Sequence, residues 1–208
     1  MAASFHLHFQ CLLGMQCADF TILAADQMNL QNIVLMKDDE DKLYEVSDRQ
    51  LMGLNGDAGD RTQFSQLVAK NLQLYQMRNK YELGTAAVTH FTRKNMNDAL
   101  QNGTPFIVNV LLAGYDEENG AQLYYLDFLA TCLQVPFASH GFGGLLGLSI
   151  LSQYYRPDLS EAQAYGVLKL CVSEIHKRLF MNIPNFCVKT ISKDGIKVLP
   201  VISPTSMT

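Results

Sequence analysis

The order in which two hydrophobic periodicities follow one another constrains the fold of this chain most. Strand-like apolar segments occupy residues 6–56, helical stripes follow over 57–104, and strand-like segments return over 106–127. Two more helical segments and a last strand pair then occupy 136–179 and 186–202. Grouped strands and grouped helices are typical of α+β proteins with antiparallel sheets. We therefore predict a four-layer αββα sandwich, in which two antiparallel sheets lie between helix pairs.

Local signals mark the helices and turns. A second helix should start at Thr85 and end before Pro105, because proline cannot continue a helix. Ser160 and Gln163 have the spacing of a capping box, which predicts the start of the last helix. The charged stretch 37–42 (KDDEDK) is interpreted as a solvated turn between two short strands.

Composition limits the class of protein. The chain has 208 residues, which favours one domain, and its net charge of -4 favours neither nucleic acid nor an anionic membrane as a partner. No apolar run reaches the roughly 20 residues of a membrane helix, and the first residues do not resemble a secretory signal. Five scattered cysteines without a CxxC pair favour reduced thiols, as in the cytoplasm or nucleus.

Several candidate sites have a plainer interpretation. His6 and His8 alternate as metal ligands sometimes do, but no third ligand has suitable spacing, so we expect an ordinary N-terminal arm. The glycine turn 140–143 lacks the lysine of a phosphate-binding loop, so backbone packing is favoured there. Cys11 and Cys17 lie in apolar segments, where cysteine usually behaves as a small buried hydrophobe.

Asp26 is the residue that composition does not explain. It follows the apolar run FTILAA directly, and a carboxylate buried at the end of such a strand is costly unless a charged or hydrogen-bonding group meets it. We therefore expect a partner for Asp26.

Five motifs in a fixed order carry a resemblance to a known family. They are AAD at 24–26, GLNGDAGD at 53–60, LLAGYDE at 111–117, LYYLD at 123–127 and PFASHGFG at 136–143. In this order and spacing the chain resembles the proteasome beta-subunit family from about Phe9 to Val201. The resemblance implies the N-terminal nucleophile hydrolase fold, which agrees with the four-layer sandwich.

The resemblance also implies a catalytic apparatus in active members. There, a threonine freed by self-cleavage after a glycine attacks the substrate, and its own amine acts as base. A lysine lowers the pKa of this catalytic apparatus, and an aspartate orients the lysine. A serine in a glycine turn, with a distal aspartate and serine, completes the set of hydrogen-bonding side chains. By this resemblance Asp26 matches the aspartate, and Lys42 is the partner expected for it.

The remaining positions do not match. The nucleophile position is Gln10, preceded by Phe9, and the serine of the glycine turn is replaced by Phe142. Leu179 and Asn182 stand in place of the distal aspartate and serine. Because glutamine has no nucleophilic oxygen, we predict a catalytically silent subunit in which Asp26 and Lys42 form a structural ion pair.

Two enzyme alternatives stay open. Cys11 is next to the nucleophile position and could act as a thiol nucleophile, if residues 1–10 were removed and the strand shifted by one residue. A self-standing hydrolase in a homomeric ring would need a threonine near its start, which this chain lacks.

The resemblance implies a structural role in a larger assembly. A silent beta subunit would fill one place in the beta ring of the 20S core particle, a 28-subunit assembly of four rings, and help to wall its proteolytic chamber. The partners implied are other alpha and beta subunits and unfolded polypeptide, in the cytoplasm and nucleus, with no cofactor. We expect a short arm over residues 1–9, one domain over 10–201 and a tail over 202–208.

Overall fold

The computed structural model of the chain describes residues 9–31, 34–180 and 183–204. His6, His8, Asn182 and the end of the predicted tail therefore lie outside the described residues. The predicted boundaries of the arm, domain and tail stay predictions.

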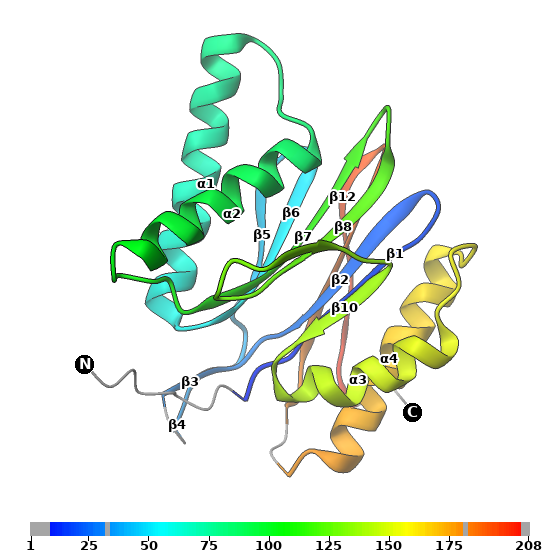
Figure 1. Cartoon of the computed structure of the whole chain (residues 1–208). Coiled ribbons are helices and arrows are strands. Elements are labelled where there is room, and N and C mark those ends of the chain that lie inside the picture. Colours follow the sequence, from blue (N-terminus) through cyan, green and yellow to red (C-terminus); the bar gives the residue numbers. More distant parts are fainter. Residues whose placement is uncertain (1–8, 32–33, 181–182, 205–208) are drawn as a thin grey trace.

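Two five-stranded antiparallel sheets stack face to face in the described part of the chain (Figure 1). The first has the order β10 (Phe137–His140), β1 (Leu12–Gln16), β2 (Phe20–Asp26), β11 (Phe186–Ser192) and β12 (Gly195–Ile202). The second has the order β5 (Leu43–Ser47), β6 (Gln50–Gly56), β7 (Val108–Asp116), β8 (Gly120–Leu126) and β9 (Cys132–Gln134).

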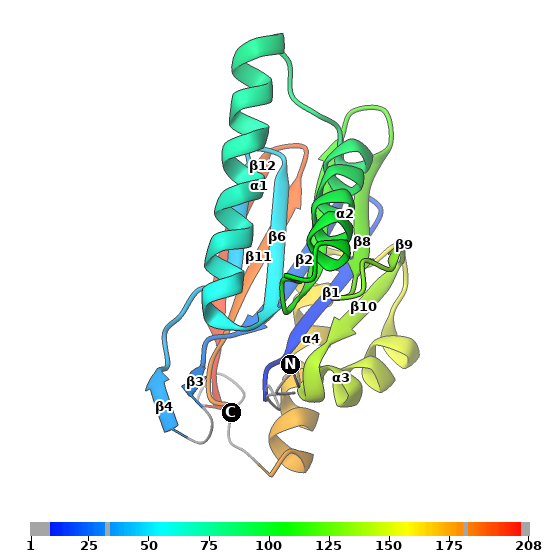
Figure 2. The ribbon, with the colours of Figure 1, turned by 60° about the vertical axis from the view of Figure 1, so that its left-hand side comes forward.

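A helix pair covers the outer face of each sheet (Figures 1 and 2). The helices α1 (Ala58–Asn79) and α2 (Thr85–Gln101) lie over the second sheet, whereas α3 (Gly141–Tyr154) and α4 (Glu161–Arg178) lie over the first. The predicted αββα sandwich is thereby confirmed. Within the described ranges, no helix combines the length and apolar character needed to cross a membrane.

Three apolar layers hold the sandwich together. One joins the first sheet to α3 and α4, one joins the second sheet to α1 and α2, and one lies between the sheets. Strand β1 alternates between two of them, because Leu13 and Met15 face the helices and Leu12 faces the other sheet. Buried on both faces, the inner strands read as nearly continuous apolar runs, and every residue of β2 is buried.

The predicted helix start and end signals are confirmed. The Ser160–Gln163 capping box is present at the start of α4, and α2 starts at Thr85 and ends before Pro105. At the start of α1, the Asp57 carboxylate accepts hydrogen bonds from the backbone N–H groups of Gly59 and Asp60.

Residues 38–42 lie between two short strands, as predicted, but these strands do not pair with each other. The strand before it, β4 (Val34–Lys37), pairs with β3 (Asn29–Gln31) in a separate two-stranded sheet, and β5 pairs with β6 instead. The stretch is also not simply a solvated turn. Glu40 forms an ion pair with the buried Arg61 at 2.7 Å, and Asp41 forms one with Lys189 at 2.9 Å. These ion pairs attach the stretch to α1 and to β11, where it connects β4 to β5.

Candidate functional site

Asp26 meets the lysine expected for it. Lys42 Nζ lies 2.7 Å from Asp26 Oδ2, and both side chains are buried. The same carboxylate accepts hydrogen bonds from the backbone N–H groups of Cys11 at 2.7 Å and Met28 at 3.2 Å. The predicted ion pair is therefore present, and its carboxylate also holds the start of β1 against the end of β2.

Burial dominates the electrostatics of this pair. It lowers the pKa of Lys42 from its ordinary value, and the negative charge and hydrogen bond of Asp26 oppose the shift only in part. The second buried cation nearby, Arg61, also lowers the pKa of Lys42, while its partner Glu40 raises it. A buried lysine without its carboxylate would be very unfavourable, which makes the pair structurally important whether or not it does chemistry.

Gln10, at the nucleophile position, is engaged through its whole side-chain amide. Gln10 Nε2 donates to the Gly56 carbonyl at 3.0 Å, and Gln10 Oε1 accepts from the Gly56 N–H at 2.6 Å. The Gly56 carbonyl also accepts a hydrogen bond from Arg61 at 2.7 Å. Acyl transfer needs free N–H donors next to the nucleophile to stabilise an oxyanion. Here the N–H group of Gly56 is already occupied by Gln10.

The glycine turn at the start of α3 packs against Gln10. Gly141 has a φ of +81°, and a Cβ added there would lie 2.0 Å from the Gln10 carbonyl oxygen. This close approach agrees with the packing role expected for the turn. Phe142 follows, and its ring lies 5.6 Å from that of Phe9, which in turn lies 5.1 Å from the ring of Phe180. An aromatic cluster therefore stands where the resemblance places a serine.

Leu179, in place of the distal aspartate, has no polar side-chain group. Leu179 ends α4 and packs against the apolar layer between α4 and the first sheet. Its counterpart at 182 lies outside the described residues. A leucine in this place contributes packing and cannot take part in a hydrogen-bond set.

Cys11 faces away from the nucleophile position. Its side chain belongs to the apolar layer under α3 and α4, where a Cβ on Gly143 would lie 3.0 Å from its Sγ. Burial, followed by the charge of Asp26, raises the pKa of the Cys11 thiol well above its ordinary value. Since the thiolate is the nucleophile, this environment is that of a structural cysteine. Cys17 is buried in the same layer, as predicted.

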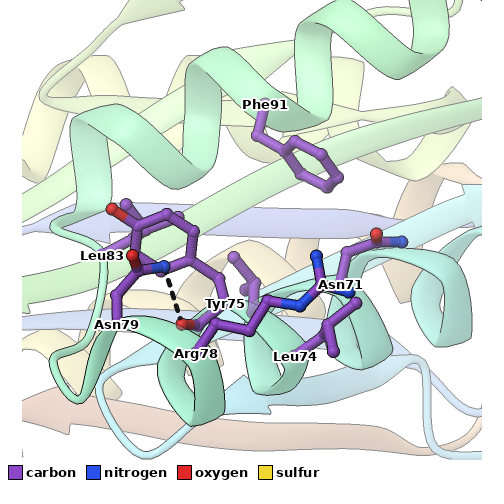
Figure 3. A pocket seen from close by; sticks show the side chains of 8 residues that line it. Asn71, Leu74, Tyr75, Arg78, Asn79, Leu83 and Phe91 are labelled. Atoms are coloured by element: carbon purple, nitrogen blue, oxygen red, sulfur yellow. Dashed lines mark hydrogen bonds between the residues drawn. The ribbon is translucent and has the colours of Figure 1, made fainter.

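A separate pocket lies away from this site. Figure 3 shows a pocket of about 420 Å³ between α1 and α2, walled by side chains such as Leu74, Tyr75, Leu83 and Phe91. None of the side chains around Asp26 or Gln10 lines this pocket. Among the described residues, no three His, Cys, Asp or Glu side chains gather as a metal site would require.

Sequence reasoning missed three groups near the site. Arg61 and its partner Glu40 lie in polar stretches of the sequence that give no sign of burial. His140 is buried beside β7, where its ring stacks on Tyr125 at 4.2 Å and its Nε2 lies 3.1 Å from the Val110 carbonyl oxygen. Its only signal in the sequence is its position as the first residue of the glycine turn.

His140 should make stability depend on pH. Burial lowers the pKa of His140 from 6.5 to about 4. Between pH 6.5 and about 4, His140 is therefore protonated in the unfolded chain and neutral in the folded chain. Its contribution is present above pH 6.5 and is lost as the pH falls towards 4, by about 3 kcal/mol in all. Urea unfolding of the chain, measured from pH 7.5 to 4.5, should therefore give a flatter profile for His140→Gln. Parallel profiles would contradict this expectation.

Comparisons with known proteins identify the family of this chain. The family model described as "Proteasome subunit" matches residues 8–191. The chain therefore belongs to the proteasome subunit family, as a beta-type subunit of the 20S core particle that acts in protein degradation and assembles with other proteasome subunits.

Its relatives point to one branch of the family. The chain is 42% identical to proteasome subunit beta type-2 of Oryza sativa subsp. japonica over 90% of its length and 88% of the relative. It is 38% identical to proteasome subunit beta type-4 of Saccharomyces cerevisiae over 89% of its length and 94% of the relative. With beta type-2 of Dictyostelium discoideum it shares 35% identity over 94% of its length and 99% of the relative. Motifs such as QMRNKYEL at 76–83 predict this likeness to the beta type-2 subunit, and the relatives confirm it.

Proposed function

We propose that this beta subunit is catalytically silent and serves the particle by its shape. The observation that carries the proposal is the contact of Gln10 with Gly56. The side chain at the nucleophile position has no nucleophilic oxygen, and its amide is paired on both sides with backbone. Phe142 and Leu179 remove two further polar groups, so that the Asp26–Lys42 pair has no nucleophile to serve.

In this proposal the subunit fills one place in a ring of a 28-subunit, four-ring assembly and forms part of the wall of its chamber. Exposed apolar side chains support extensive contacts with other subunits, because a monomeric protein rarely exposes many of them together. They include three consecutive residues of β4 and several side chains of α3 and α4: Val34, Leu35, Met36, Leu145, Leu148 and Leu170. Residence in the cytoplasm and nucleus, and unfolded polypeptide as the cargo of the chamber, belong to the same proposal.

A probe of the active sites tests the proposal. Intact particles treated with an electrophile that reacts with N-terminal threonines should carry the label on active subunits and none on this chain. Intact-mass measurement of this chain should also show residues upstream of Gln10, because Phe9-Gln10 offers no glycine–threonine junction for self-cleavage.

The variant Cys11→Ala distinguishes the silent subunit from the alternative in which Cys11 acts as a thiol nucleophile. It should leave every peptidase activity of the particle within error, because the buried thiol contributes packing only. A labelled Cys11, together with the loss of one peptidase activity in the alanine variant, would overturn the silent-subunit proposal.

A further inference from the structure

We draw no further inference here: the strongest candidate, the exposed apolar surface of β4 formed by Val34, Leu35 and Met36, carries nothing, because within the described ranges β4 pairs only with β3 and nothing in the structure shows what covers this surface.

Discussion

Asp26→Asn is expected to destabilise the folded subunit by about 3–5 kcal/mol. The substitution leaves Lys42 buried without a counter-charge, and removing one partner of a buried ion pair costs about this amount. It also weakens the anchor for the backbone N–H groups of Cys11 and Met28. The measurement is the urea concentration at which the chain leaves the assembled particle, followed by native mass spectrometry.

A second variant shows whether the charge is the cause. In Asp26→Asn combined with Lys42→Met, the buried cation is removed together with its partner, so part of the lost stability should return. If the single variant resists urea as well as the unmodified chain does, the ion pair contributes nothing and the structural role assigned to it is wrong. A double variant less stable than the single one would point to Lys42 as a packing residue instead.

Gly56→Ala is expected to cost at least about 3 kcal/mol or to prevent assembly. Gly56 has a φ of +127°, which side chains rarely adopt, and the new Cβ would lie 2.1 Å from the Ile107 carbonyl oxygen and 2.9 Å from Val108 Cα. Both neighbours are backbone atoms, which cannot relieve the clash by changing a side-chain rotamer. Movement of Gly56 would also break its hydrogen bonds with Gln10 and Arg61. Incorporation of the variant into particles measures the effect.

Gly103→Ala is the matched control for this substitution. Gly103 also has a positive φ, of +74°, but a Cβ added there meets nothing within 4 Å. Only the left-handed backbone should then be penalised, by about 1–2 kcal/mol. Equal effects at both positions would show that the contact with Ile107 is unimportant and that backbone conformation alone decides.

In the proposal of a silent subunit, the residues at the expected catalytic positions have structural roles instead. Three changes reinforce one another at one end of the sandwich, where Gln10 binds Gly56, Phe142 stacks on Phe9, and Leu179 joins the core. A single substitution of Gln10 by threonine would therefore leave a nucleophile without the serine, the distal aspartate or a free N-terminal amine.

Sequence alone determined the layers of this protein. Strands buried on both faces are mostly apolar, helices that cover one face show an apolar stripe, and caps such as Ser160 mark where helices start. These signals are local, so they predicted the αββα order, the limits of α2 and the start of α4. The resemblance to the family likewise predicted that Asp26 contacts Lys42, 16 residues further along the chain.

Only the tertiary structure decided which polar side chains are buried and which charged groups they pair with. Residues 37–42 are polar enough to be read as a solvated turn, yet Glu40, Asp41 and Lys42 each pair with a charge on a different element. The burial of Asn55, Arg61 and His140 likewise depends on segments far away in the sequence. A polar residue is buried only where the fold supplies partners or packs other elements over it, and no local pattern records which distant atoms those are.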